Sequence, residues 1–244
     1  MPHSEVPNGF AAAADGGSGG GASADAFGRL AMELHDVDGV EETVEAVVQF
    51  ALHALGCTYA GVVLVARGRR PEVLALTDPL VATLYELQIE AGDGPMITAI
   101  QEERVVLVAD VEAETRWSRA WITQVRAAEI RTIVHLPLLA HGRAEAVLSL
   151  YDKAPNAFDD DDLAIAHILA RHASVAIANA REEESLAEAI DARKLIGQAM
   201  GILMERYGLD GDRAFEVLKR YSQQYNRKLR DVAQELIDTR RLPH

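Results

Sequence analysis

The chain has 244 residues, of which 49% are hydrophobic and 25% are charged, and this composition is typical of a globular protein with one or two domains. Its single cysteine, Cys57, excludes an intramolecular disulfide and a cysteine-based zinc site, and it fits a reducing compartment. No basic segment precedes an apolar core of signal-peptide length, and no run of about 18 apolar residues occurs. We therefore expect a cytoplasmic protein without a membrane partner.

The formal net charge of −14 is unevenly distributed along the chain. Residues 1–192 carry 13 Lys and Arg against 31 Asp and Glu, whereas residues 193–244 carry 11 against 7. An acidic body with a basic tail indicates a contact with nucleic acid or another acidic surface that is confined to the tail. The alternative is an ordinary solvated basic face.

The first part of the chain changes character near Ala26. Residues 1–24 are rich in Gly, Ala and Ser and show no apolar periodicity, so we expect a disordered leader. From there to Leu55, apolar residues recur every three or four positions, which predicts a helix that Gly56 ends.

The middle of the chain alternates short β-branched segments with helical ones. We expect antiparallel hairpins formed by 59–65 with 73–77 and by 132–139 with 144–151, a strand at 105–108, and helices at 81–90, 96–101 and 121–129. Hairpins separated by a helical crossover favour an antiparallel sheet with helices on its faces, so the predicted fold class is α+β.

Four acidic residues, 159–162, precede a long apolar-periodic segment. They are typical of a helix N-terminus rather than of a metal site, because no His or turn glycine accompanies them. One long helix without Gly or Pro is expected to continue to Gly197, and its first part has a 3-4 apolar rhythm close to a coiled-coil seam. We predict that this seam joins two copies of the chain, through Leu163, Ala166, Ala170, Ala173, Ile177 and Ala180.

Three short apolar stripes in the tail predict a three-helix bundle. The first ends at Tyr207 and Gly208, and Asp210 or Asp212 can cap the second helix. The third stripe covers 229–237. The residues expected to form the buried face of the second helix are Ala214, Phe215, Leu218, Tyr221 and Ser222.

No pattern of an enzyme is present. The eight histidines lack paired ligand spacing, and there is no nucleophile-elbow, zincin, Walker or dinucleotide-binding motif. Cys57 has no His or basic neighbour, so a buried apolar role is favoured over a nucleophile. We expect no catalysis, no metal and no cofactor, and haem ligation by His135 or Cys57 is not expected.

Basic side chains are concentrated around the helices of the tail. On a helical wheel, Arg227, Lys228 and Arg230 avoid the apolar stripe of the third helix, so they face solvent beside helix N-terminal amides, where phosphate oxygens bind well. Tyr225 and Tyr221 can stack on unpaired bases; alternatively, Tyr221 belongs to the core and Tyr225 covers the edge of the bundle. The predicted RNA-binding residues are Arg193, Lys194, Lys219, Arg220, Tyr225, Asn226, Arg227, Lys228 and Arg230.

A set of residues with a characteristic spacing runs through the tail: Arg193, Ile196, Ala199, Gly201, Leu203, Met204, Ala214, Phe215, Ser222, Leu229 and Ala233. With these residues the tail resembles an ANTAR domain, a three-helix RNA-binding module of transcription antitermination regulators. Many members have lysine where this chain has Met200, which removes one candidate phosphate contact. In element order and in the 131–151 hairpin, residues 26–180 resemble a GAF sensor domain.

Together the two resemblances imply a leader over 1–24, a GAF-like sensor domain over 25–180 and an ANTAR domain over 181–244, with a long helix joining the two domains. In that family the ANTAR module binds RNA bearing two hairpin loops and stabilises an antiterminator, and a homodimer is the natural reader of paired loops. The unidentified ligand of the sensor would lie between sheet and helices.

Two alternatives remain open. One is a ligand-binding or protein-interaction sensor whose tail serves only for dimerisation. The other, a helix-turn-helix DNA binder, ranks below it because no helix pair joined by a short Gly turn precedes a basic recognition helix.

Overall fold

The structure is a computed structural model, and it describes residues 37, 39–65 and 70–242. The predicted leader and the predicted helical turns before Val37 lie outside the described residues. The chain divides into two compact units, Met1–Ala178 and Asn179–His244. The predicted boundary between residues 180 and 181 stays a prediction.

The first unit is built on a five-stranded sheet with the order β2-β1-β5-β4-β3, in which all neighbouring strands are antiparallel. Both predicted hairpins form, β1 with β2 and β4 with β5, and the pairing of β1 with β5 joins them. The predicted α+β class is therefore confirmed. The strands are β1 (Tyr59–Leu64), β2 (Glu72–Leu76), β3 (Val106–Val108), β4 (Thr132–Ala140) and β5 (Arg143–Asp152).

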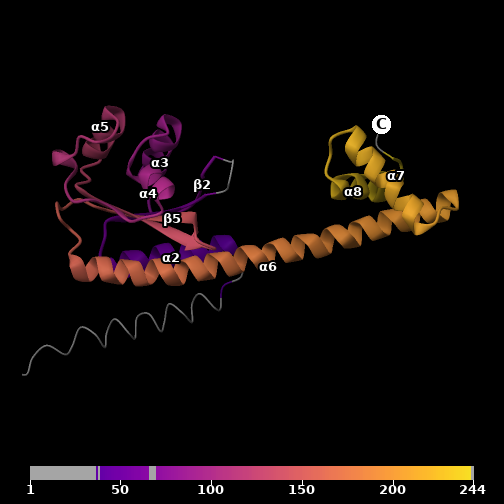
Figure 1. Ribbon diagram of the computed structural model, residues 1–244, viewed down its shortest axis with the longest axis horizontal. Coiled ribbons are helices and arrows are strands. Elements are labelled where there is room, and N and C mark those ends of the chain that lie inside the picture. The colour runs from indigo at the N-terminus through magenta and orange to yellow at the C-terminus, as the bar shows by residue number, and fades with distance from the viewer. Residues whose placement is uncertain (1–36, 38, 66–69, 243–244) are drawn as a thin grey trace, which may run out of the picture. The chain divides into compact units, whose positions relative to one another are not determined.

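Helices cover both faces of this sheet (Figure 1). Strand residues alternate between the faces, and both faces are apolar. Ile133, Val147 and Tyr151 belong to the buried cluster under α3 and α5, whereas Val134 and Leu148 point to the opposite face. One face carries α2 (Val40–Leu55) and the first part of α6 (Asp160–Tyr207), and the other carries α3 (Pro79–Ala91), α4 (Pro95–Glu102), the short helix η1 (Val111–Ala113) and α5 (Arg119–Ala127).

Local signals set the helix ends. Gly56 ends α2 in the left-handed conformation with φ of 59°, as predicted. The acidic run begins α6, because the backbone N–H of Asp162 donates to the carboxylate of Asp159 at 2.9 Å and that of Asp159 donates to the carboxylate of Asp162 at 3.1 Å. These reciprocal bonds satisfy amides that have no partner inside the helix, so the run is a helix N-terminus.

The apolar seam of α6 is covered by the chain itself. Ala166, Ala170, Ala173, Ile177 and Ala180 are buried within a single copy, and Leu163 is half-buried. A second copy would reach these side chains only after they were uncovered, so the predicted use of this seam between two copies stays a prediction.

The same helix is long and apolar enough, by composition, to cross a membrane. Its most apolar 18-residue window has a mean hydropathy of 1.3, and 39% of that window is buried. The helix carries core residues such as Leu169 and Ala173, which are fully buried. A core helix passes the same test, so the hydropathy is weak evidence for a membrane span.

The second unit is a three-helix bundle of the last part of α6 with α7 (Gly211–Gln224) and α8 (Leu229–Thr239). The carboxylate of Asp210 accepts from the backbone N–H of Arg213 at 2.8 Å and so caps α7. The buried core consists of Ala199, Leu203, Ala214, Leu218, Val232, Ala233 and Leu236.

One predicted core position of α7 is wrong. Phe215 leaves 37% of its surface exposed, whereas Val217 packs against the core in its place. The buried side of α7 is centred between Ala214, Leu218 and Tyr221, and at about 100° per residue Phe215 lies roughly a quarter turn away from that centre. Phe215 therefore stands at the border between the core and solvent.

Candidate functional site

Exposed cations without an ion pair are the main feature of the second unit's surface. Within residues 70–242, four of the seven predicted RNA-binding cations are exposed and make no ion pair. They lie on α6, on α7 and in the turn before α8, and they are Arg193, Lys194, Arg220 and Lys228. An unpaired, solvent-exposed cation can bind a phosphate at a low free-energy cost, because no existing ion pair has to be broken.

The other three predicted cations are paired at the surface. Such exposed pairs are weak and screened by salt, so an incoming phosphate can compete for them. The ammonium of Lys219 lies 3.1 Å from the Glu216 carboxylate, the Arg230 guanidinium lies 3.4 Å from that of Glu188 and 3.6 Å from that of Asp231, and Arg227 pairs with Glu235.

Hydrogen bonds fix the turn between α7 and α8, which contains predicted contact residues. The hydroxyl of Ser222 donates to the Arg227 carbonyl at 2.6 Å, and the Arg227 N–H donates to the Ser222 carbonyl at 3.0 Å. Asn226 adopts φ of 50° inside this turn. Lys228 is the N-cap residue of α8, and no side chain caps that helix. The first amides of α8 and the Lys228 ammonium therefore offer positive charge to an anion at one end of the bundle.

The two tyrosines of α7 stack on each other. The ring centroids of Tyr221 and Tyr225 are 6.0 Å apart, and the ring planes differ by 19°. Tyr221 is half-buried and packs against the core, whereas Tyr225 leaves 37% of its surface exposed. This arrangement supports the core interpretation of Tyr221, and Tyr225 covers the edge of the bundle; base stacking by Tyr225 stays a prediction. Met200 also packs against the core, so that position makes an apolar contact here.

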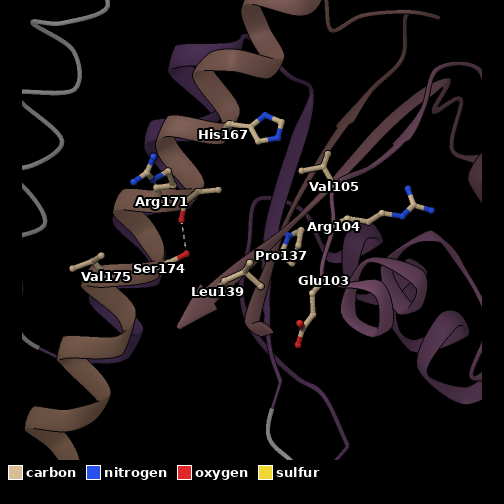
Figure 2. Close-up of a pocket in the computed structure, with 10 residues that line it drawn as sticks. Glu103, Arg104, Val105, Pro137, Leu139, His167, Arg171, Ser174 and Val175 are labelled. Carbon is tan, nitrogen blue, oxygen red and sulfur yellow. Dashed lines mark hydrogen bonds between the residues drawn. The ribbon is translucent and has the colours of Figure 1, made fainter. Parts of the chain in front are cut away.

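The first unit has a groove of about 460 Å³ beside the end of β4 (Figure 2). It lies between α6, β4 and the segment that leads into β3, and this volume is within the usual range for small-molecule sites. The sheet is open at this edge, because the pairing of β3 with β4 stops at Val106 and His135. The lining residues are Glu103, Arg104, Val105, Pro137, Leu139, His167, Ala170, Arg171, Ser174 and Val175.

The walls of this groove are mostly apolar. Figure 2 shows the imidazole of His167 on the side of α6 that faces Val105, whereas the guanidinium groups of Arg104 and Arg171 point away from Leu139. The Nδ1 atom of His167 lies 2.6 Å from the Leu163 carbonyl, so Nδ1–H donates there and Nε2 is left for an occupant. The groove thus offers apolar contact and one imidazole.

Comparisons with known proteins agree with this division of the chain. A GAF domain model matches residues 38–178, which is more than half of the chain, and an ANTAR domain model matches residues 184–237. The chain belongs to the GAF domain family and carries an ANTAR domain. GAF domains are sensor domains, ANTAR domains are RNA-binding modules of antitermination regulators, and neither class is generally enzymatic. This combination is typical of soluble regulators.

Solved structures confirm the GAF fold at low sequence identity. The GAF domain of an Acinetobacter phosphoenolpyruvate-protein phosphotransferase is 14% identical, covers 67% of this chain and 98% of that chain, and has a TM-score of 0.53. The free methionine-R-sulfoxide reductase of Neisseria meningitidis, in complex with its substrate, is 16% identical, covers 69% of this chain and 96% of that chain, and has a TM-score of 0.54. The phytochrome photosensory core module of Stigmatella aurantiaca is 12% identical, covers 86% of this chain and 46% of that chain, and has a TM-score of 0.58. No protein of curated function matches the chain.

Sequence reasoning missed a buried polar cluster in the GAF domain. The Nδ1 atom of His135 lies 2.6 Å from the Ser149 hydroxyl, and the ring of Tyr151 meets the rings of His135 and Tyr85 edge-on at 5.9 and 6.4 Å. Burial lowers the pKa of His135 to about 3 and raises the pKa of both tyrosines, so all of these groups are neutral near pH 7. The cluster could have been found from the predicted β4–β5 hairpin, because its register places His135 opposite Ser149.

Cys57 also lies in the GAF domain and is buried. Burial raises the pKa of its thiol to about 12, which leaves almost no thiolate at neutral pH. The interpretation of Cys57 as a buried apolar residue therefore agrees with its surroundings.

Proposed function

We propose that the protein is a cytoplasmic RNA-binding regulator of transcription antitermination. Its ANTAR bundle binds RNA bearing two hairpin loops as a homodimer, and its GAF domain senses a signal. The observation that carries the proposal is the set of exposed, unpaired cations on a bundle that matches the ANTAR model, in a chain whose overall net charge is −14.

The charge pattern favours a polyanion at the bundle. Residues 193–244 carry 11 Lys and Arg against 7 Asp and Glu, so phosphate contacts are electrostatically favourable there and unfavourable over the acidic remainder. The N-terminus of α8 adds uncapped amides next to Lys228. A hairpin loop brought to this end of the bundle would meet both kinds of donor.

Dimerisation is supported by apolar side chains that the second unit leaves in solvent. Leu186 and Ile190, four residues apart on α6, leave 58% and 65% of their surfaces exposed. Side chains at this spacing share one face of a helix, and a second copy can cover that face as in a coiled coil. Light scattering at micromolar concentration should show a dimer, and replacement of both residues by Gln should shift the mass toward the monomer. A wild-type monomer would contradict this part of the proposal.

The GAF domain supplies a site for the signal in the groove beside β4. Its apolar walls and the free Nε2 of His167 suit an apolar ligand with a single hydrogen-bonding group. No cofactor or metal enters this proposal.

The test is ultraviolet crosslinking in cells followed by sequencing of the RNA recovered with the intact protein. We expect enrichment of leader RNAs with two adjacent hairpins, and loss of that enrichment in the double variant Arg220→Gln, Lys228→Gln at unchanged protein level. Recovery of RNA no higher than from cells that lack the protein would reject RNA binding, whereas equal enrichment in the wild type and the double variant would show that these two cations do not contact the RNA. If RNA binding were rejected and the wild type were still a dimer, a sensor whose tail serves only for dimerisation would replace the proposal.

A further inference from the structure

Phe215 is an exposed aromatic side chain that the bundle does not need for its core. It leaves 37% of its surface in solvent, and the buried residues of α7 are Ala214 and Leu218 on either side of it. The exposed part of the phenyl ring makes no contact inside the chain, so it is available to another molecule.

One face of α7 leads from Phe215 past Lys219 to the α7–α8 turn. Lys219 and Ser222 follow Phe215 by four and seven residues, so all three side chains lie on the same face of α7. Ser222 holds the turn through its bond to the Arg227 carbonyl, and Lys228 follows in that turn. At a helical rise of 1.5 Å per residue, the turn begins about 15 Å from Phe215 along the axis of α7. This is one continuous surface with an aromatic ring at one end and a free cation at the other.

We propose that Phe215 stacks on an unpaired base of the RNA loop, while Lys219 contacts the neighbouring phosphate and Lys228 contacts a phosphate further along the strand. The inference rests on the proposed RNA binding and adds a base-contacting residue to it. Every base has a π-face, and an aromatic ring beside cations is the usual platform for single-stranded nucleic acid. The tail over residues 193–244 carries 11 Lys and Arg against 7 Asp and Glu, and this positive charge favours RNA over an apolar protein surface as the occupant.

The stacking role thereby moves from Tyr225 to Phe215. The ring of Tyr225 already lies over Tyr221, with ring centroids 6.0 Å apart, and it completes the edge of the bundle. No aromatic contact within the described residues engages the ring of Phe215. The Lys219 pair with Glu216 is exposed and weak, so Lys219 can turn to a phosphate.

The experiment uses the full chain and a synthetic RNA probe. The probe is the tightest binder from a pool of RNAs that carry two hairpins with randomised loops. Affinities are measured for the wild type, Phe215→Ala, Phe215→Leu and Phe215→Tyr, and Tyr207→Ala is the matched control because Tyr207 is an exposed aromatic residue of the same bundle. Circular dichroism checks that each variant is folded.

We expect Phe215→Ala to weaken binding about 5- to 150-fold, as for the loss of one stacked base. Phe215→Tyr should bind like the wild type, Phe215→Leu should lose most of the affinity, and Tyr207→Ala should change little. The slope of affinity against salt should stay that of the wild type in Phe215→Ala, because no phosphate contact is lost. A probe with an abasic site at the stacked position should weaken the wild type and leave Phe215→Ala no weaker than before.

Other results would overturn the inference. Wild-type RNA affinity in Phe215→Ala would show that the ring does not stack on a base. The same conclusion would follow if an abasic site, at every loop position, weakened RNA binding by Phe215→Ala as much as it weakens binding by the wild type. A smaller mass of Phe215→Ala in light scattering, together with such additivity, would assign the ring to contact with a second copy. Both outcomes leave RNA binding by the wild type intact, whereas failure of every RNA in the pool to bind the wild type rejects the proposed function as well.

Discussion

Replacement of Gly61 by Ala probes how tightly α3 packs on the sheet of the GAF domain. A Cβ atom at this position would lie 3.0 Å from the hydroxyl oxygen of Tyr85, 3.1 Å from the backbone carbonyl oxygen of Ala75 and 3.1 Å from Cγ1 of Val81. These distances are shorter than ordinary van der Waals contact. Tyr85 and Val81 are fully buried and Ala75 contributes backbone of a paired strand, so none of the three can move freely.

The expected loss of stability follows from two opposing effects. Overpacking of a tight core costs about 1–3 kcal/mol, whereas Ala in place of Gly lowers the entropy of the unfolded chain and returns about 0.4–1 kcal/mol. We expect Gly61→Ala to be less stable by about 1–2 kcal/mol, which for a protein of this size lowers the melting temperature by about 2–8 °C.

The same substitution on α6 should have the opposite sign and serves as the control. A Cβ atom at Gly197 would meet nothing within 4 Å, and Ala is a better helix former than Gly by about 0.8–1 kcal/mol. Urea unfolding followed by tryptophan fluorescence reports on Gly61→Ala, because Trp117 and Trp121 both lie in the GAF domain, and circular dichroism reports on Gly197→Ala. Wild-type or higher stability of Gly61→Ala would refute the packing argument.

Two further predictions concern buried titratable groups. The pKa of His135 is about 3 in the folded chain and near 6.5 when unfolded, so the unfolded chain binds more protons between these values; stability should fall as pH drops from 7 to 5, and it should fall less in His135→Phe. Equal falls in urea titrations of the two proteins would contradict this reasoning. Cys57 should resist iodoacetamide at pH 8 in the folded protein and react in concentrated urea, as mass spectrometry can show, and rapid native labelling would contradict the raised pKa.

Much of the GAF fold was predictable because its signals are local. The β4–β5 hairpin has two largely apolar runs separated by a short Gly turn, and the register that follows needs no distant information. The seam of α6 was visible as a 3-4 rhythm, but a rhythm reports that a face is buried and not what buries it. Ala173 and Ile177 are buried within one chain, and a contact between copies at this seam stays a prediction.

The sites were less predictable because they depend on side chains from distant segments. The pair of Arg230 with Glu188 joins residues 42 positions apart, and no local pattern separates a paired arginine from a free one such as Arg220. The groove beside β4 gathers three segments, 103–105, 137–139 and 167–175, through the topology of the sheet. Phe215 lies about a quarter turn from the centre of the buried face of α7, and the sequence pattern did not separate this border position from the core.

RNA binding by the unpaired cations has one sharp test, the salt dependence of RNA affinity in matched double variants. Arg220→Gln with Lys228→Gln removes two unpaired cations of the ANTAR bundle, and Arg104→Gln with Arg171→Gln makes the same charge change in the GAF domain. We expect the first double variant to reduce the slope of log affinity against log salt by about 0.7 for each lost contact to single-stranded RNA, which is about 1.4 for each copy and about 2.8 for the homodimer, and the second to leave it unchanged. Equal slopes in the wild type and both variants would show that these cations do not hold the phosphates.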